Sequence, residues 1–397
     1  ITEYVDLAGN PSSEDRRTGD DNSKKIRIDL SKPTITPSSV AISTDNDLGG
    51  TDPVDSQKYL AKAGNTITVA FTTEEELSSA EVVINGEEVI ASGSGTSWSA
   101  TTSDALTEVD EVSFQINYVD LAGNPSSEDR TGDDNSKKIR IDLSKPTITP
   151  SSVAISTDNK LAGTDPEDEQ KYLAKDGDTI TLEFSTSEPL SSAEVVINGE
   201  PIAARKQSSD TDGTQWEAVT LAAFASEVDE VSFQITEYVD LAGNTAITEA
   251  PRTSDDNSNK VRIDVDPATI MTTWVSTDNK LAGTDPDDPL KYLAKSEDAI
   301  TLKFSTSEPL SSAKVEINGE PVAVRKQSSD TDGTQWEAVT QNPFISDAEE
   351  VSFQITEYVD LAGNTAIIGP PRTSDDNSNK VRIDVDPATI MTTWVST

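Results

Sequence analysis

The sequence lacks the residues on which many kinds of catalysis and metal binding depend. Among its 397 residues there is no cysteine and no histidine. Disulfide bridges, zinc sites built from these two residues, thiol nucleophiles and serine–histidine–aspartate triads are therefore excluded. The sequence also lacks an uninterrupted run of about 18 apolar residues, the length that a membrane-spanning helix would need.

Basic residues are scarce as well. The chain has 31 Lys and Arg against 72 Asp and Glu, which gives a net charge of −41. Such a charge repels the phosphates of nucleic acids and anionic lipid headgroups, so we expect no nucleic-acid partner and no direct insertion into a membrane. Apolar residues make up 34% of the chain, and their regular spacing favours several small cores over a disordered chain.

Internal repetition dominates what is present. The string YVDLAGN occurs four times, starting at Tyr4, Tyr118, Tyr238 and Tyr358. The string STDN occurs three times, starting at Ser43, Ser156 and Ser276. A fixed spacing of this kind is typical of an array of similar structural units.

The repeats predict the domain organisation. Three full repeats are expected at residues 33–145, 146–266 and 267–386. Residues 1–32 would be the C-terminal part of a preceding repeat, and residues 387–397 the first strand of a following one. The chain is therefore interpreted as a window on a longer array, or as a chain whose end segments pair with neighbouring chains.

Each repeat has the pattern of short β-strands. Polar and apolar residues alternate over Thr179–Ser185, and Asn198-Gly199 separates two further candidate strands. Tyr172–Lys175 is interpreted as a turn, and no helical periodicity of 3.6 residues is found. About seven strands in each repeat predict an all-β fold, with tandem Ig-like β-sandwich domains arranged as an elongated rod.

The order of motifs carries a resemblance. The second repeat contains GDTITLEFSTSEPL, VVING, a strand with a tryptophan, VSFQITEYVDLAGN and KVRIDVDP, in that order. This order resembles the tandem bacterial Ig-like repeats in the extender, or stalk, region of giant RTX-type adhesins, and it covers nearly the whole chain. The resemblance implies an extracellular, cell-surface location, neighbouring repeats as partners, and Ca²⁺ at the domain junctions.

Carboxylates gather in loops and linkers, where two successive repeats would meet. Ca²⁺ prefers six to eight oxygen ligands, many of them carboxylates, and would relieve the repulsion among these groups. Candidate ligands at the first junction are Asp45, Asp52, Asp142, Glu188, Asp240, Asp255 and Asp256. Candidate ligands at the second junction are Asp158, Asp165, Asp264, Glu308, Asp360, Asp375 and Asp376. The alternative is that these loops are solvated acidic segments of a protein adapted to salt.

Two shorter motifs are open to more than one interpretation. The DLAGN segment has the residues of a tight turn, and metal contact is a possible additional role for Asp120, Asp240 and Asp360. The segment Asp210-Thr211-Asp212-Gly213 resembles the start of a calcium loop, but it lacks the glutamate at position twelve. A hairpin turn explains that segment equally well.

These observations predict a non-enzymatic structural array, a Ca²⁺-stiffened stalk or spacer of a cell-surface adhesin or appendage. One alternative is a subunit of a self-assembling extracellular filament or surface layer, with identical chains as partners. A second alternative is an array of glycan-binding modules, which would need exposed aromatic residues. The recurrent Trp98, Trp216 and Trp336 are instead expected in the cores. Carboxylate pairs in loops that occur three times favour structure over catalysis.

Overall fold

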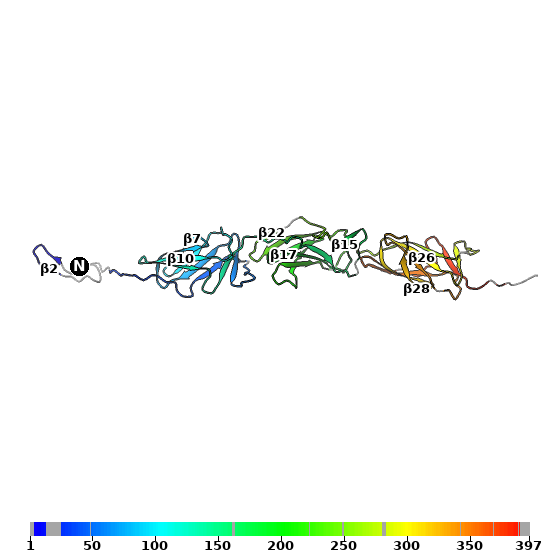
Figure 1. Ribbon diagram of the computed structural model, residues 1–397, viewed down its shortest axis with the longest axis horizontal. Coiled ribbons are helices and arrows are strands. Elements are labelled where there is room, and N and C mark those ends of the chain that lie inside the picture. The colour runs from blue at the N-terminus through cyan, green and yellow to red at the C-terminus, as the bar shows by residue number, and fades with distance from the viewer. Residues whose placement is uncertain are drawn as a thin grey trace, which may run out of the picture. The chain divides into compact units, whose positions relative to one another are not determined.

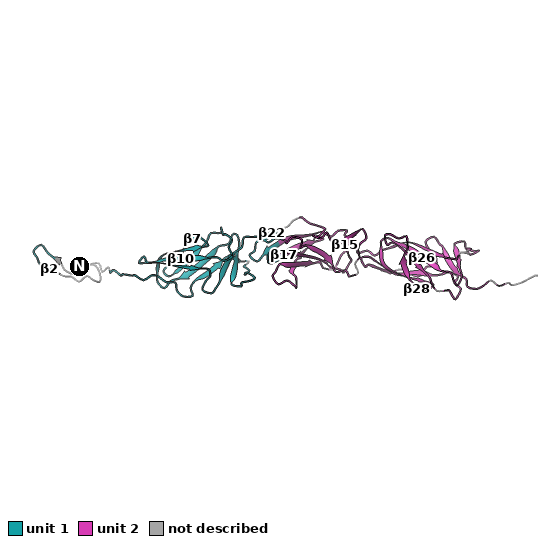
Figure 2. Cartoon of the chain, viewed as in Figure 1, with its two compact units in different colours: residues 1–147, 188–192, 238–246 teal, residues 148–187, 193–237, 247–397 magenta. Residues whose placement is uncertain are grey.

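The chain is built from β-strands. The computed structural model describes residues 4–12, 25–47, 49–160, 163–221, 223–247, 250–279, 283–341, 343–367, 369–387 and 389. Within these ranges every regular element is a strand (Figure 1), which confirms the predicted all-β fold. The described residues contain no helix that is long and apolar enough to cross a membrane. The chain divides into two compact units (Figure 2), residues 1–147, 188–192 and 238–246 in unit 1, and residues 148–187, 193–237 and 247–397 in unit 2.

Residues 33–145 of unit 1 form two four-stranded sheets and a parallel pair. The first sheet has the order β3 (Ala41–Thr44), β5 (Ile67–Thr72), β9 (Ser97–Thr101) and β8 (Ser92–Ser94). The second has the order β11 (Pro125–Arg130), β10 (Phe114–Asp120), β6 (Leu77–Ile84) and β7 (Glu87–Ile90). The pair consists of β4 (Lys58–Ala61) and β12 (Lys138–Ile141), and a hairpin of β1 (Tyr4–Val5) and β2 (Pro11–Ser12) precedes them all.

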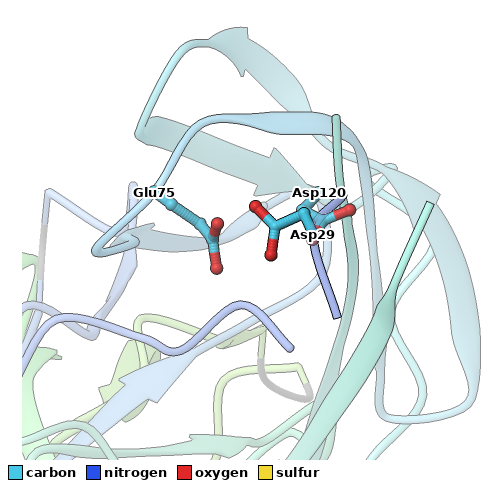
Figure 3. Close-up of side chains that lie close together, drawn as sticks. All are labelled: Asp29, Glu75 and Asp120. Atoms are coloured by element: carbon cyan, nitrogen blue, oxygen red, sulfur yellow. The ribbon is translucent and has the colours of Figure 1, made fainter. Parts of the chain in front are cut away.

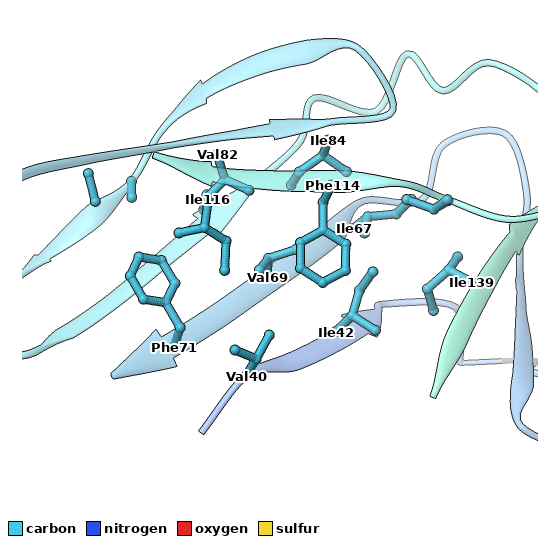
Figure 4. Packing of buried hydrophobic residues seen from close by; sticks show 14 of the residues in the cluster. Val40, Ile42, Ile67, Val69, Phe71, Val82, Ile84, Phe114, Ile116 and Ile139 are labelled. Carbon is cyan, nitrogen blue, oxygen red and sulfur yellow. The ribbon is translucent and has the colours of Figure 1, made fainter. Parts of the chain in front are cut away.

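The core of this repeat lies between the two sheets. Successive side chains of a strand point to opposite faces, so the alternation in β5 buries Ile67, Val69 and Phe71 on one face. Phe114 and Ile116 of β10 belong to the same buried cluster, as Figure 4 shows. Residues from both sheets thus fill one interior, which is the arrangement of a β-sandwich.

The second repeat has the same arrangement of strands. One sheet has the order β13 (Ala154–Thr157), β16 (Ile180–Ser185), β20 (Gln215–Val219) and β19 (Arg205–Lys206). The other has the order β18 (Glu200–Ala203), β17 (Leu190–Ile197), β21 (Phe233–Asp240) and β22 (Thr245–Ile247). A third, smaller sheet has the order β14 (Thr164–Asp165), β15 (Asp168–Ala174) and β23 (Lys260–Ile263).

The third repeat follows the same plan. One sheet has the order β24 (Ile270–Thr277), β26 (Ile300–Thr306), β30 (Gln335–Val339) and β29 (Val324–Lys326). The other has the order β28 (Glu320–Val322), β27 (Leu310–Ile317), β31 (Phe353–Asp360) and β32 (Thr365–Ile367). A parallel pair consists of β25 (Lys291–Ala294) and β33 (Lys380–Ile383). The chain is thus an array of Ig-like β-sandwich repeats.

The structure corrects one expectation about local structure. Tyr172–Lys175 was predicted as a turn, but residues Asp168–Ala174 form β15, which pairs in parallel with β23. Tyr172 lies opposite Val261, so the partner strand is far away in the sequence. The prediction was wrong because a short segment that pairs with a distant strand shows little local alternation.

Each described repeat also has more strands than the seven expected. In the second repeat, β18 pairs with β17 of one sheet, and the next few residues form β19, which pairs with β20 of the other sheet. A single edge segment that changes sheets is therefore divided into two short strands. Such a division leaves almost no trace in the polar and apolar pattern.

Other expectations are confirmed. The Asn198-Gly199 turn joins β17 to β18, with positive φ angles of 50° and 84°. Trp216 and Trp336 are buried in the cores, and Trp98 packs against the core of the first repeat. The repeat bounds stay a prediction, and the strand predicted within residues 387–397 lies outside the described residues apart from 387 and 389.

Candidate metal centres

Acidic side chains meet in threes at three places among the described residues. Each triad has one aspartate from a linker and one glutamate from a loop between two strands. Its third member is the aspartate that begins a DLAGN segment. One carboxylate oxygen from each residue lies within 4.8 Å of those of the other two. The triads are Asp29–Glu75–Asp120 and Asp142–Glu188–Asp240 in unit 1, and Asp264–Glu308–Asp360 in unit 2.

The ends of strands position the third triad. Asp264 directly follows β23, Glu308 lies in the connection between β26 and β27, and Asp360 is the last residue of β31. The DLAGN turn fixes Asp360, because Oδ1 of Asp360 accepts a hydrogen bond of 2.8 Å from the backbone N–H of Asn364. An aspartate that caps its own turn in this way has little freedom to rotate away.

Two carboxylates of the third triad have little contact with solvent. Asp264 and Asp360 are only 4% and 1% exposed. Oδ1 of Asp264 and Oδ2 of Asp360 are buried without a hydrogen-bond partner in the described part of the chain. Buried carboxylate oxygens without partners are costly unless a cation or a proton satisfies them.

The pKa values in this triad reflect the same cost. Burial, followed by the nearby Asp264 and Asp360, raises the pKa of Glu308 to about 7. Burial and the charge of Asp360 raise the pKa of Asp264 to about 6, and burial also raises the pKa of Asp360. Each group therefore resists ionisation beside the other two, so a bound divalent cation would stabilise the charged form.

The second triad has the same chemistry. Burial, followed by the charges of Asp142 and Asp240, raises the pKa of Glu188 to about 7. Burial also raises the pKa of Asp142. Arg140 is a cation beside this triad, with Nη2 3.3 Å from Oδ2 of Asp142 and Nη1 3.1 Å from Oδ2 of Asp52. Because Arg140 is divided between two carboxylates, it cannot neutralise the triad.

Sequence reasoning missed two members of the first triad. Figure 3 shows Asp29 and Glu75 beside Asp120, with the carboxylates close together. Asp29 lies in the segment IDLSKP, which recurs unchanged around Asp142, and Glu75 has the same place before its strand as Glu188. A comparison of equivalent positions in the repeats could therefore have identified both residues.

Two pairs of predicted ligands have protein partners outside the triads. Asp52 and Asp165 form ion pairs with Arg140 and Arg262, at 3.1 and 3.3 Å. Oδ1 of Asp45 accepts a hydrogen bond from the backbone N–H of Thr66, and Asp158 accepts one from Thr179 in the same way. These four carboxylates lie outside the triads, and their assignment to metal stays a prediction.

Four more predicted ligands bind the backbone of an edge strand. Oδ2 of Asp256 accepts a hydrogen bond of 2.9 Å from the N–H of Val153, and Oδ2 of Asp255 accepts one of 3.1 Å from Ile155. Asp376 and Asp375 accept hydrogen bonds from β24 in the third repeat in the same way. These contacts satisfy N–H groups that a sheet edge would otherwise leave open.

The residues of the triads fit a hard divalent cation. Carboxylate oxygens are typical ligands of Ca²⁺ and Mg²⁺, and three of them leave positions that water can occupy. Calcium tolerates irregular geometry better than magnesium, which demands a near-ideal octahedron. An open crevice of about 560 Å³ lies beside the third triad and is lined by Asp264, Glu308 and Arg262 among others.

Comparisons with solved structures find several that resemble the chain. One comes from work on a 1.5-MDa bacterial ice-binding adhesin, and the chain in that structure is 15% identical over 89% of this chain and its own full length, with a TM-score of 0.40. Another is the titin fragment I67–I69, which is 8% identical over 90% of this chain and all of that one, with a TM-score of 0.32. No family model and no curated protein matches the sequence.

Proposed function

We propose that the chain is a non-enzymatic, extracellular structural array, a calcium-stiffened stalk or spacer of a cell-surface adhesin or appendage. One observation supports this proposal: three carboxylates from equivalent positions of the repeats meet at each of three linkers. In the third triad, two carboxylate oxygens are buried and have no hydrogen-bond partner among the described residues. A structural role explains why the triad recurs, because every linker of an array connects two repeats in the same way.

Each triad joins two parts of the array. In the second and third triads the linker aspartate follows the last strand of one repeat, whereas the glutamate and the other aspartate belong to the next repeat. A bound Ca²⁺ would neutralise most of the charge of the triad and hold the linker against the following repeat. Extracellular modules bind calcium with dissociation constants of about 10⁻⁴–10⁻³ M, so an extracellular location would keep such sites filled.

Calcium titration tests the proposal directly. We expect calorimetry on the chain stripped with EDTA to detect three calcium sites, and we expect millimolar CaCl₂ to raise the melting temperature and narrow the range of conformations seen by X-ray scattering. Equimolar MgCl₂ is the control for a general charge effect. If calcium produced no binding heat and left melting and scattering unchanged, the stiffening mechanism would be refuted.

A second candidate, lateral assembly of identical chains, is favoured by one surface feature. Met271 and Trp274 on the edge strand β24 are 62% and 56% exposed, whereas Ala41 and Ala154 occupy the place of Trp274 in the other repeats. Exposed apolar side chains on one edge favour contact with another surface. Sedimentation velocity of the chain and of a Met271→Ser/Trp274→Ser variant tests it, and equal monomeric profiles at high concentration would reject it.

A further inference from the structure

A second set of contacts links successive repeats through side-chain amides and backbone carbonyl groups. The side-chain amide of Asn159, in the STDN segment of the second repeat, donates hydrogen bonds to two backbone carbonyl groups. One is that of Leu173 in the same repeat, at 3.1 Å, and the other is that of Ala362 in the next repeat, at 2.7 Å. Asn159 is buried, and Ala362 is fully buried.

The same contacts occur in unit 1. Asn46 of the first STDN segment donates to the carbonyl groups of Leu60 and Ala242, both at 2.9 Å. Close backbone approach accompanies this contact, since a Cβ atom on Gly50 would lie 2.8 Å from the carbonyl oxygen of Leu241. Two places in the chain therefore have the same asparagine between the same two kinds of carbonyl group.

A second asparagine completes the contact from the opposite side. The side-chain amide of Asn364, which ends the fourth DLAGN segment, donates to the carbonyl oxygen of Asp264 at 2.9 Å. Asn244 donates to the carbonyl oxygen of Asp142, also at 2.9 Å. The STDN asparagine thus holds the DLAGN turn of the next repeat, and the DLAGN asparagine holds the linker of the preceding repeat.

The STDN asparagine has the same local contact in the third repeat. Asn279 donates to the carbonyl oxygen of Leu293 in its own repeat, at 3.0 Å. In each of the three repeats, the asparagine is therefore held by a carbonyl group of its own repeat.

We propose that the STDN and DLAGN segments form a metal-independent clasp, through which one Ig-like repeat recognises the DLAGN turn of the next. The donors are neutral amides and the acceptors are peptide carbonyl groups, so neither a cation nor a proton is needed to make the contact. The partner that this surface fits is another repeat with a DLAGN turn. The clasp holds Asp264 beside Glu308 and Asp360, and so preorganises the triad whether or not calcium binds there.

Distance measurements between spin labels test the clasp in the second and third repeats. The chain has no cysteine, so Glu200→Cys and Glu320→Cys, both exposed, introduce two specific labelling sites. In EDTA we expect a narrow distance distribution for the labelled chain, and a distribution at least twice as wide after Asn159→Ala. Asn279→Ala is the matched control, because it changes the equivalent asparagine of the third repeat, which bonds to Leu293 and takes no part in the contact between Asn159 and Ala362. We expect that control to leave the distribution unchanged.

Two further measurements keep the result interpretable. Asn159→Asp preserves the shape of the side chain but replaces the donor with a carboxylate, so it should widen the distribution as Asn159→Ala does. Circular dichroism checks that each variant keeps its strands. Equal widths for the unsubstituted chain, Asn159→Ala and Asn279→Ala in EDTA would overturn the clasp. Adding calcium to the unsubstituted chain tests the proposed function separately, because the clasp is measured entirely without calcium.

Discussion

Two copies of one short sequence behave differently in this protein. The DLAGN turns at residues 120–124 and 360–364 have the same hydrogen bond of 2.8 Å from the asparagine N–H to the aspartate carboxylate. Ala122 is nevertheless exposed and Leu121 is 69% exposed, whereas Ala362 is 0% exposed. The local sequence therefore forms the turn, whereas its exposure depends on the segments that pack against it.

The difference extends to the charge of the aspartate. Burial acts to raise the pKa of Asp120, but hydrogen bonds from Asn124 and from the backbone of its turn outweigh burial, and the pKa is lowered. At Asp360, burial outweighs the same hydrogen bonds, and the pKa is raised. In two turns of identical sequence, Asp120 therefore ionises more readily than Asp360.

The largest expected effect comes from neutralising the third triad. Asp264→Asn combined with Glu308→Gln removes two of three ligands, so calorimetry should count one calcium site fewer. The lost stabilisation is about 2.7 kcal/mol when free calcium is a hundredfold above the dissociation constant. Glu320→Gln, an exposed acid outside the triads, is the control for a charge effect alone.

The equivalent change in the first triad sharpens the comparison. Asp29 and Glu75 are half-buried, and Asp29 also pairs with Arg27 at 2.9 Å. Asp29→Asn with Glu75→Gln should therefore remove a weaker site than the variant of the third triad does. An unchanged count of sites in either double variant would contradict the assignment of that triad to calcium.

A smaller effect is expected from filling the space beside the turn. Ala362→Leu places extra atoms in a fully buried position, which costs about 1–3 kcal/mol by overpacking. Ala122→Leu changes an exposed position and should stay within about 0.5 kcal/mol. Urea unfolding monitored by tryptophan fluorescence compares the two variants, and equal costs would show that the two turns have similar surroundings.

The smallest effect is the pH dependence of the calcium-free protein. The raised pKa values of Glu308 and Asp264 mean that the folded state binds more protons than the unfolded state. Stability from these groups is therefore present at low pH and is lost as pH rises from about 4 to about 7. Because Glu308 is half-exposed, we expect less than about 1 kcal/mol for the triad after solvent screening.

Thermal melting in EDTA at pH 5 and pH 8 measures this dependence. The Asp264→Asn/Glu308→Gln variant is the control and should show a flatter profile. The lowered pKa of Asp120 has the opposite sign, since its contribution is lost as pH falls through that lowered pKa. If the triad variant had the same pH profile as the unsubstituted chain, the triad would not be the source of the pH dependence.

Much of the fold and part of the site could be predicted from local patterns. Alternation over Thr179–Ser185 predicted a strand there, and the Asn198-Gly199 signal predicted the hairpin. The candidate ligands included all members of the second and third triads, because carboxylates in linkers and loop ends stand out. Strand β15 was missed, since its parallel partner β23 is distant in the sequence.

The division of roles among the acids could not be predicted from their positions. Asp255 and Asp256 lie in an acidic loop like the triad residues, but they accept hydrogen bonds from Ile155 and Val153. Asn159 gave no signal as a residue that contacts the next repeat, because its acceptor is a backbone carbonyl group, which any residue has. Only the packing of loops that are far apart in the sequence distinguishes these roles.

The sequence by itself determined the repeated strands, the tight turns and the presence of an acid at each linker, because these depend on side-chain periodicity and local backbone preference. The tertiary structure decided which three acids meet, which carboxylates bind the backbone instead, and whether a given DLAGN turn is exposed or buried. Those outcomes depend on desolvation and on contacts between segments that are far apart in the sequence, as between Asn159 and Ala362.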